Sequence, residues 1–271
     1  MINDTHLHTS FSEDCSTPPE DIIRRAAALG MKEICITDHY DRDFPFDGWI
    51  FDPDEYFRTL LPLKKEYEGQ LDVHIGVEIG LQPHLKDFYG QFLKNWPFEF
   101  VIGSIHVLLG DDPYFRERYD MTDEEYYRAY FGYMLECVRS CAGVFDVLGH
   151  LDYVVRYGFD GPAEYSYARY AEYIDPILDI AIENDTALEI NTGAIKYGQD
   201  ILHPSEDVVR KYLEKGGRKF TVGSDAHRPQ DVGRGFDRAR EYLESFGVKV
   251  PAPDEPGNGI FFYSDQPGIR C

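Results

Sequence analysis

The stretch Asp4-Thr5-His6-Leu7-His8 stands at the start of the chain and has the pattern of a strand that carries two histidines. Because successive side chains of a strand point to opposite faces, His6 and His8 share one face and Leu7 lies on the other. Two imidazoles held side by side make half of a metal site. A strand with an ordinary polar face would give the same pattern, so the rest of the chain must decide between these interpretations.

A helix and a second strand follow this stretch within the first 40 residues. Pro18-Pro19-Glu20-Asp21 has the proline and the acids of a helix start, and Gly30 ends the apolar stripe that follows. The apolar run Ile34-Cys35-Ile36 then leads into Thr37-Asp38-His39. Strand, helix and strand in this order are typical of a βαβ unit.

The same alternation continues along the chain and gives seven strand-then-helix units. Later strands are predicted at 71–81, 98–105, 144–148, 187–190, 220–223 and 260–263. Later helices are predicted at 54–68, 84–95, from a Thr122 cap onward, 163–184 (kinked or split by Pro176), 205–215 and 232–246. No linker interrupts the pattern and no glycine fingerprint follows the first strand. The sequence therefore favours one parallel barrel with outer helices over an open doubly wound sheet.

The composition limits the classes of partner. Hydrophobic residues make up 43% of the 271 residues, which is enough for a full core. A net charge of −22 repels nucleic acid and anionic membranes, so we expect neither, whereas a small phosphorylated substrate is compatible if bound metals reverse the local charge. There is no signal-peptide pattern and no apolar run of membrane length. Five scattered cysteines without a CxxC pair indicate reduced thiols and a cytoplasmic protein.

The placement of the histidines points to chemistry. Six of the nine histidines fall at or just after the end of a predicted strand, and two acids, Glu78 and Asp225, have the same kind of position. The six are His6, His8, His39, His106, His150 and His227. The carboxyl ends of barrel strands converge on one rim, so these side chains should become neighbours there. Imidazole together with carboxylate suits zinc, manganese or iron better than calcium or magnesium alone.

Six short motifs carry a resemblance that covers essentially the whole chain. They are Asp4-Thr5-His6-Leu7-His8, Thr37-Asp38-His39, the lone Glu78, Gly103-Ser104-Ile105-His106, Gly149-His150-Leu151-Asp152 and Ser224-Asp225-Ala226-His227. In this order they resemble the PHP family, named for polymerase and histidinol phosphatase. The resemblance implies a distorted seven-stranded parallel (β/α)7 barrel of TIM-like type, with residues 1–271 as a single domain and a trinuclear metal site.

Residue by residue, the resemblance implies three divalent metal ions (zinc, manganese or iron) and nine ligands. The ligands are His6, His8, Asp14, His39, Glu78, His106, His150, Asp225 and His227. Glu78 is expected to bridge two metals, and His106 and His150 to hold the third. Asp14 comes from a loop, where a loop cap or a solvated acid is the alternative interpretation. Three divalent ions would outweigh three carboxylates and leave a cationic pocket suited to a phosphate ester.

Within the family, the chain resembles the free-standing histidinol-phosphate phosphatase branch. The resemblance lies in 149–152 followed by Arg156-Tyr157-Gly158, and in Glu189-Ile190-Asn191-Thr192-Gly193 followed by Lys196. It implies that Arg156 and Lys196 bind the substrate phosphate, Arg156 with two parallel donors and Lys196 as a point charge. Surface ion pairs are the alternative for both, and Lys196 stands where an arginine is expected.

The implied reaction is hydrolysis of L-histidinol phosphate to L-histidinol and phosphate, a step of histidine biosynthesis. A metal-bridging hydroxide would attack phosphorus, and Asp225 or a water near His227 would supply the proton for the leaving alkoxide. The alternative is a phosphoesterase of the same family that acts on another small phosphorylated metabolite or a nucleotide. The sequence leaves the oligomeric state open.

Residues beside this set carry weaker expectations. Acids in the loop after His39 would suit the ammonium and imidazole of such a substrate, although a solvated acidic loop is the simpler interpretation; these acids are Asp41, Asp43 and Asp47. Asp4 and Asp38 are expected either to orient ligand imidazoles or to cap strand ends. His203 is expected to be a residue of the loop at a helix start rather than a substrate contact.

Overall fold

Seven parallel strands form the centre of the computed structural model, which describes residues 3–160, 165–250 and 261–263. Their order is β1–β2–β4–β5–β6–β7–β8, so each strand lies beside its neighbour in the sequence of parallel strands. Their bounds are β1 Asp4–Leu7, β2 Glu33–Ile36, β4 Asp72–Gly80, β5 Phe100–Ser104, β6 Val147–Leu148, β7 Ala187–Asn191 and β8 Lys219–Gly223. The predicted succession of parallel strands is confirmed.

The barrel is nearly closed, because the end of β1 meets the segment after β8. Leu7 pairs with Ala226, the His8 amide donates to the Ala226 carbonyl at 3.0 Å, and the Asp225 amide donates to the His6 carbonyl at 2.9 Å. An open doubly wound sheet is therefore excluded, and the prediction of a distorted seven-stranded barrel is confirmed. This closure also brings residues near 225 against the first strand.

Two further short strands were not predicted as parts of the barrel wall. β3 (His39–Tyr40) pairs with the second half of β4, where His39 lies opposite Glu78. β9 (Phe262–Tyr263) pairs antiparallel with the start of β8. The strand predicted at the end of the chain, 260–263, thus begins at a residue outside the described part of the chain, and its described part extends the sheet from β8.

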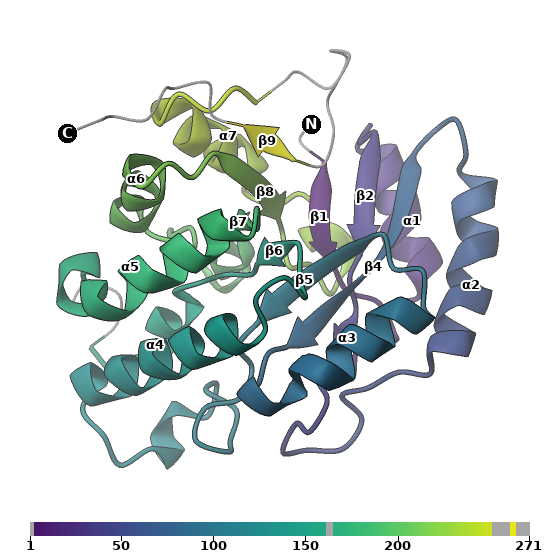
Figure 1. Ribbon diagram of the computed structural model, residues 1–271. Coiled ribbons are helices and arrows are strands. Elements are labelled where there is room, and N and C mark those ends of the chain that lie inside the picture. The colour runs from purple at the N-terminus through teal and green to yellow at the C-terminus, as the bar shows by residue number, and fades with distance from the viewer. Residues whose placement is uncertain (1–2, 161–164, 251–260, 264–271) are drawn as a thin grey trace.

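Helices follow the strands and lie outside them (Figure 1). Their bounds are α1 Pro19–Ala28, α2 Pro53–Glu66, α3 Lys86–Asn95, α4 Asp123–Ser140, α5 Tyr167–Glu183, α6 Glu206–Glu214 and α7 Phe236–Ser245. Thr122 caps α4 as predicted, with a reciprocal bond between its backbone and Glu125. Short 3-10 helices precede or replace parts of the predicted helices; they are η1 Pro83–Leu85, η2 Arg116–Arg118, η3 Tyr153–Tyr157, η5 Gly193–Tyr197 and η6 Pro229–Asp231.

The prediction that Pro176 could split its helix was wrong, because α5 runs without a break past it. Ile174, Ile177 and Leu178 are fully buried around the proline, and their packing outweighs the lost backbone hydrogen bond. The predicted helix start at 163 lies outside the described residues. The continuity of α5 keeps it packed along α4, as Figure 1 shows.

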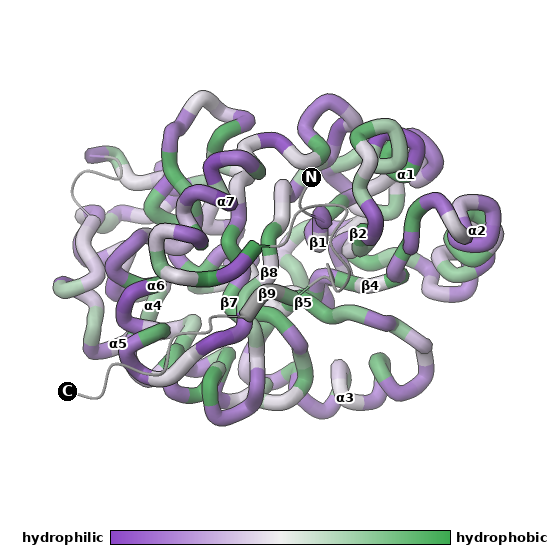
Figure 2. The backbone as a smooth tube through the Cα atoms, turned by 90° about the horizontal axis from the view of Figure 1, so that it is seen from above, coloured by the Kyte–Doolittle hydropathy of each residue, from purple (hydrophilic) through white to green (hydrophobic). Residues whose placement is uncertain are grey.

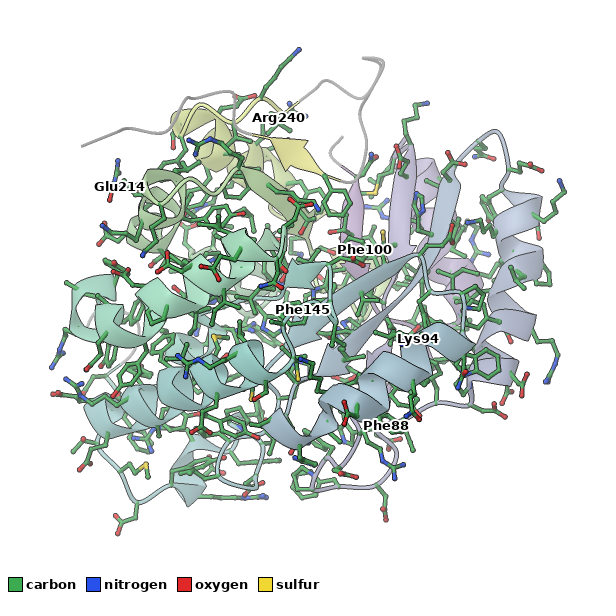
Figure 3. All side chains as sticks on the ribbon, in the orientation of Figure 1. Phe88, Lys94, Phe100, Phe145, Glu214 and Arg240 are labelled. Atoms are coloured by element: carbon green, nitrogen blue, oxygen red, sulfur yellow. The ribbon has the colours of Figure 1, made fainter. Side chains whose placement is uncertain are left out.

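Apolar side chains fill the space between the strands and the helices, and the tube in Figure 2 shows green segments along the strands interrupted by hydrophilic positions. Figure 3 shows Phe100 and Phe145 among the strands and Lys94 and Glu214 directed outward. The four described thiols are buried and free, including Cys137 on α4 and Cys141 directly after it. Among the described residues, helices of the length and apolarity needed to span a bilayer are absent.

Candidate metal centre and substrate pocket

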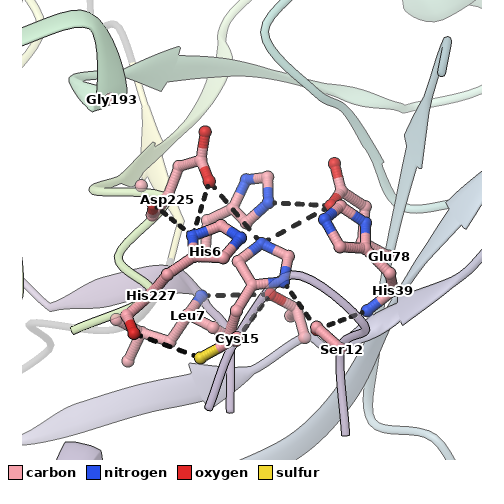
Figure 4. Close-up of polar contacts among 12 residues, drawn as sticks. His6, Leu7, Ser12, Cys15, His39, Glu78, Gly193, Asp225 and His227 are labelled. Carbon is pink, nitrogen blue, oxygen red and sulfur yellow. Dashed lines mark hydrogen bonds and ion pairs between the residues drawn. The ribbon is translucent and has the colours of Figure 1, made fainter. Parts of the chain in front are cut away.

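The nine predicted ligands gather at the carboxyl ends of the strands. Figure 4 labels His6, His39, Glu78, Asp225 and His227 among them. His6, on β1, and His8, directly after it, are both fully buried, so the interpretation of β1 as a strand with a solvent-facing polar side is wrong. The others come from β3, β4, the loop after β1 and the segments after β5, β6 and β8. One rim therefore unites side chains that lie up to about 220 residues apart in the sequence.

Glu78 lies at the centre of the cluster, with each of its oxygens facing different imidazoles. Its Oε2 is 3.1 Å from His6 Nε2 and 3.0 Å from His39 Nδ1. Its Oε1 is 3.0 Å from His150 Nε2 and 3.3 Å from His106 Nε2. A carboxylate that turns its two oxygens toward two groups of ligands has the arrangement needed to bridge two cations.

Asp225 and Asp14 occupy the other side of the cluster. Asp225 Oδ1 lies 3.7 Å from His8 Nε2 and 3.5 Å from His227 Nδ1. Asp14, although it belongs to a loop, places Oδ2 3.0 Å from His227 Nε2 and Oδ1 3.9 Å from His39 Nε2. Its carboxylate therefore lies within reach of the cluster, although the side chain is 42% exposed.

The chemistry of these side chains fits divalent cations. Buried atoms that face the cluster take part in no hydrogen bond within the described chain; they are His6 Nε2, His8 Nε2, His39 Nδ1, Glu78 Oε2 and His227 Nε2. The cluster contains four groups of three residues that share members, and within each group the three ligand atoms lie within 4.8 Å of one another. Buried polar atoms are normally paired. Several imidazole nitrogens and carboxylate oxygens that converge without such bonds form a donor set typical of zinc, manganese or iron.

The electrostatics of the cluster follow from the same proximity. Burial raises the pKa of Glu78, but the neighbouring imidazoles, His6 and His106 foremost, outweigh it and hold that pKa well below its usual range. Burial opposes a charged His39, yet Glu78 and Asp14 raise its pKa to about 9. In the metal-free protein, protons would thus occupy imidazole nitrogens of the cluster. A metal ion that binds these nitrogens must displace the protons.

Two carboxylates behind the cluster orient its imidazoles, and the sequence interpretation did not find them in this role. Glu189 Oε1, on β7, lies 2.6 Å from His6 Nδ1, while Glu189 Oε2 accepts the backbone amide of His150 at 2.7 Å. Asp41 Oδ2 lies 2.8 Å from His106 Nδ1. Such partners fix the tautomer and the angle of a metal-binding imidazole. A charged residue in the buried β7 was the available signal for Glu189.

Asp4 and Asp38 do not contact an imidazole. Asp4 accepts hydrogen bonds from the backbone amides of His6, Ser224 and Gly233 and from the Ser224 hydroxyl, so it joins the ends of β1 and β8. Asp38 accepts from Thr9 and from Ser12 Oγ, which in turn lies 3.0 Å from His8 Nδ1. The role as a cap at a strand end is confirmed for both, and Asp38 reaches His8 only through a serine.

The backbone around Asp225 is shaped for the cluster. Asp225 has φ of 52°, a left-handed conformation that non-glycine residues adopt only when their surroundings hold them there. Gly223, at the end of β8, lies so close to His6 and Glu189 that a Cβ atom would overlap both side chains. The glycine therefore permits β8 to approach the His6–Glu189 pair.

A cavity of about 670 Å³ opens above the cluster. Arg156 and Lys196, the two predicted phosphate-binding residues, both line it. Lys196 Nζ donates to the Asp225 carbonyl at 2.7 Å and lies 3.6 Å from Asp225 Oδ1. The Arg156 guanidinium lies over the rings of Tyr153 and Tyr157, with 5.1 and 5.7 Å to their centroids. Neither cation has the geometry of an ordinary surface ion pair.

Aromatic side chains from three segments between strands and helices also line the cavity. We call this set the aromatic wall; it consists of Phe44, Trp49, Tyr114, Phe115 and Tyr197. The Phe44 and Trp49 rings lie 4.3 Å apart, and Trp49 lies 5.2 Å from the His39 ring. Tyr114 and Tyr197 remain 61% and 68% exposed, so their rings are open to a bound molecule.

The acids expected at the mouth of the pocket are placed differently. Asp41 is buried against His106, Asp43 is exposed and pairs with His84, and Asp47 is exposed and does not line the cavity. The acids that do line the cavity outside the ligand set are Asp112 and Asp231. The simpler interpretation, a solvated acidic loop, holds for Asp43 and Asp47, whereas Asp41 is buried, and none of the three acids lines the cavity. His203 is a buried loop residue, as expected, and does not line this cavity.

The family model described as PHP domain matches residues 4–193, which is more than half of the chain. The chain belongs to the PHP family. A second model, described as PHP-associated, matches residues 205–238 and includes the segment with Asp225 and His227. The ligand motifs therefore lie within two matched regions that together span the barrel.

Curated relatives are similar over nearly their whole length. The probable histidinol-phosphatase of Clostridium acetobutylicum is 34% identical over 92% of this chain and 95% of its own. The histidinol-phosphatase of Lactococcus lactis is 32% identical over 90% of this chain and 91% of its own. A crystal structure of the Lactococcus lactis histidinol phosphate phosphatase, complexed with zinc, L-histidinol and phosphate, aligns with a TM-score of 0.80 at 28% identity, covering 91% of this chain and 94% of that one.

Proposed function

We propose that this protein is a metal-dependent phosphoric monoester hydrolase that converts L-histidinol phosphate and water to L-histidinol and phosphate, a step of histidine biosynthesis. The observation that carries the proposal is the buried cluster of imidazoles and carboxylates around Glu78. The positively charged side chains of Arg156 and Lys196 line the same cavity. Relatives similar over nearly the whole chain are named histidinol-phosphatase or probable histidinol-phosphatase, and the crystal structure of the Lactococcus lactis enzyme holds zinc, L-histidinol and phosphate.

The metal centre is proposed to hold three divalent ions through the nine residues around Glu78. His6, His8 and Asp225 form one group of ligand atoms, and His6 shares a second group with Glu78 and His150. His39 belongs to both remaining groups, one with His8 and His227 and one with His106 and Asp41, a carboxylate outside the nine. Divalent ions at such a site lower the pKa of water and offset the charge of a phosphate ester. Zinc, manganese and iron all suit this mixture of imidazole and carboxylate.

The cations in the cavity are proposed to bind the phosphate group. Arg156 is held by two tyrosine rings and can offer two parallel N–H donors to phosphate oxygens. Lys196 is held by the Asp225 carbonyl and offers a point charge. Because the two residues come from different strand ends, they constrain the phosphate from two directions. Hydrolysis then breaks the bond between phosphorus and the leaving oxygen and forms one to the oxygen of water.

The leaving oxygen needs a proton, and Asp225 and His227 are the proposed source. Both line the cavity beside Lys196. The Asp225 carboxylate is oriented by its own strained backbone and by Lys196, and His227 Nδ1 lies 3.1 Å from the Asp225 carbonyl. A proton held between these two groups, or on a water beside His227, is within reach of the phosphate subsite.

The leaving group of L-histidinol phosphate carries an imidazole and an ammonium group. The aromatic wall offers ring faces for the imidazole, and Asp112 offers a carboxylate for the ammonium. We propose a cytoplasmic location, since the described thiols are free, and no nucleic-acid partner, since the net charge is −22. A different small phosphate ester is the second candidate, because the exposed rings of the wall accept other planar groups.

A substrate panel with metal analysis tests the proposal. Protein loaded with zinc or manganese is assayed for phosphate release from L-histidinol phosphate, an aryl phosphate, a nucleotide and a sugar phosphate. We expect L-histidinol phosphate to give the highest kcat/KM and the metal content to approach three ions per chain. Turnover of L-histidinol phosphate no faster than that of the aryl phosphate would refute the substrate assignment, and a metal content near zero would refute the metal centre.

The variant Glu78→Gln serves as the inactive control for this experiment, because it disrupts the proposed metal centre. It keeps the size of the side chain but removes the charge between the two ligand groups, so we expect kcat/KM to fall by about a thousandfold or more. The melting temperature and circular dichroism show whether the variant is folded. Activity within about tenfold of the wild type would mean that Glu78 does not hold the metals used in the reaction.

A further inference from the structure

Asp152 is a buried carboxylate that lies outside the metal cluster and the substrate cavity, yet it ties two segments of the pocket together. It is 1% exposed. Its Oδ1 accepts the Nδ1 proton of His203 at 2.7 Å, and its Oδ2 accepts the backbone amide of Ser205 at 2.9 Å. The partners lie 51 and 53 residues further along the chain. Asp152 therefore fixes the distance between its own segment and the segment of His203 and Ser205.

The first of these segments carries Arg156. Asp152 is the residue that directly precedes η3 (Tyr153–Tyr157), so a shift of Asp152 moves the start of η3. Within η3, Arg156 Nε donates to the Tyr153 carbonyl at 3.4 Å and its guanidinium lies over the rings of Tyr153 and Tyr157. The guanidinium is thus oriented by η3 itself. The position of η3 therefore determines where the Arg156 guanidinium lies.

The second segment carries Lys196. The backbones of Asn191 and His203 exchange two hydrogen bonds, of 2.7 and 3.0 Å, and so close residues 191–203 into a loop. η5 (Gly193–Tyr197) lies inside this loop and presents Lys196 to the cavity. The base of the loop at His203 is the point that Asp152 holds. One carboxylate consequently anchors both the segment of the guanidinium and the segment of the ammonium.

We propose that Asp152 is a positioning residue that sets the separation of Arg156 and Lys196 across the phosphate subsite. It acts through His203 and Ser205 and does not touch the substrate. The inference rests on the proposed function, in that the two cations are taken to bind the phosphate group. A bidentate arginine and a lysine must be spaced to match a phosphate, and a displacement of about 1 Å from an optimal arrangement can cost about a hundredfold in rate.

The alternative role for Asp152 is to stabilise the fold without affecting the spacing of the cations. A stabilising role and a positioning role predict different results when Asp152 is substituted. Loss of fold stability lowers the melting temperature and the fraction of active protein, which lowers kcat and leaves phosphate affinity unchanged. Loss of positioning weakens the binding of inorganic phosphate and raises KM, because both depend on the two cations together.

The experiment compares Asp152→Asn with Asp146→Asn in the full-length, metal-loaded protein. Asp146 lies at the opposite end of β6 and its Oδ2 accepts the Val101 amide at 2.9 Å, so it is a similar carboxylate clamp remote from the cavity. The probe is inorganic phosphate, measured by calorimetry and as an inhibitor of aryl phosphate hydrolysis. For Asp152→Asn we expect phosphate affinity to fall and KM to rise, each by about ten- to a hundredfold, with unchanged metal content. For Asp146→Asn we expect neither change.

Variants of His203 test the path of the effect even if Asp152→Asn fails to fold. His203→Leu removes the donor to Asp152, whereas His203→Asn retains a side-chain N–H close to the position of Nδ1. We expect weak phosphate binding in the leucine variant and recovery of most of it in the asparagine variant. Equal phosphate affinity in both variants and the wild type would overturn the proposal.

A double variant identifies the residue through which Asp152 acts. In an Arg156→Ala background, Asp152→Asn should weaken phosphate binding by much less than it does in the wild type, because one of the two positioned cations is already absent. Fully additive losses would overturn the proposal. Since phosphate binding is measured directly, a protein that binds phosphate but does not hydrolyse L-histidinol phosphate would disprove the substrate assignment while leaving the role of Asp152 intact.

Discussion

The metal cluster and the aromatic wall line a single cavity but are built from different parts of the barrel. Most cluster residues stand on strands or within three residues of a strand end, and His6, His8 and Glu78 are fully buried. The wall stands on loops, and Tyr114 and Tyr197 are more than half exposed. The comparison separates two tasks: the strand ends fix the reactive centre, and the loops determine which leaving group fits beside it.

This difference extends to the surroundings of each region. Cluster imidazoles are held by further buried groups, as His6 is by Glu189 and His106 by Asp41. The Tyr114 ring makes edge-to-face contacts with the rings of Phe115 and Tyr157. Changes at the cluster should therefore have large effects on every substrate, whereas changes at the wall should have small effects that depend on the leaving group.

After Glu78→Gln, the largest effect in this comparison is expected from Asp41→Asn. The substitution keeps the shape of the side chain but replaces the carboxylate that orients His106 with a neutral amide. Groups of this kind contribute about 10- to 100-fold to metal affinity or activity, so we expect a loss of this size in kcat/KM for every phosphate ester tested. Steady-state kinetics and metal analysis of the purified variant provide the measurement.

Asp43→Asn is the matched control, because Asp43 lies two residues further along the same loop and pairs with the exposed His84. We expect its kinetics to remain within about twofold of the wild type, since exposed ion pairs contribute little. If both variants lost activity to the same extent, the loop as a whole, and not the contact with His106, would be responsible.

A second prediction concerns the protons of the cluster. Glu78 and Asp14 raise the pKa of His39 to about 9 against the effect of burial, so in the metal-free protein His39 carries a proton at pH 7. A metal binds only the neutral imidazole, and metal binding must therefore release protons. Apparent metal affinity should rise with pH up to about 9, by about tenfold per pH unit for each proton displaced.

Calorimetry of zinc binding to protein stripped by a chelator, in buffers that differ in ionisation enthalpy, measures the number of protons released. His39→Asn removes the group while leaving a neutral side chain, and should release fewer protons. Equal proton release by both proteins, or affinity independent of pH between 6 and 8, would show that His39 is already neutral before the metal binds.

The sequence predicted the cluster well because its pattern is local. Alternation along β1 places His6 and His8 on one face, and the repeated rhythm of strand and helix places the remaining histidines at strand ends. The contact of Glu189 with His6 depends instead on how β7 lies relative to β1, 183 residues earlier, and no local pattern reports it. The buried position of Asp41 has the same cause, since it depends on where His106 lies after β5.

Loop geometry was the least predictable part of the molecule. Acids after His39 suggested a pocket mouth, but Asp41 turns inward and Asp112, in a loop about 70 residues later, lines the cavity instead. The continuous α5 shows a related limit, because the effect of Pro176 depends on the packing of the residues around it. Tertiary packing decided each of these cases over local propensity.

The smallest expected effect is that of Tyr114→Ala in the aromatic wall. The Tyr114 ring is 61% exposed and contributes a face to the cavity. Stacking of aromatic rings contributes about 0.5–1.5 kcal/mol, so we expect KM for L-histidinol phosphate to rise about two- to tenfold with little change in kcat. Inhibition by inorganic phosphate, which lacks a leaving group, should remain unchanged.

Leu109→Ala is the control for this wall variant, because Leu109 lies in the same loop, is 63% exposed and does not line the cavity. It should leave KM unchanged. If Tyr114→Ala weakened phosphate inhibition as much as it raised KM, the wall would be acting on the phosphate subsite, and the division between a fixed reactive centre and a selective wall would be wrong. If instead only KM rises, and only for substrates with a planar leaving group, the loops are where this barrel distinguishes one phosphate ester from another.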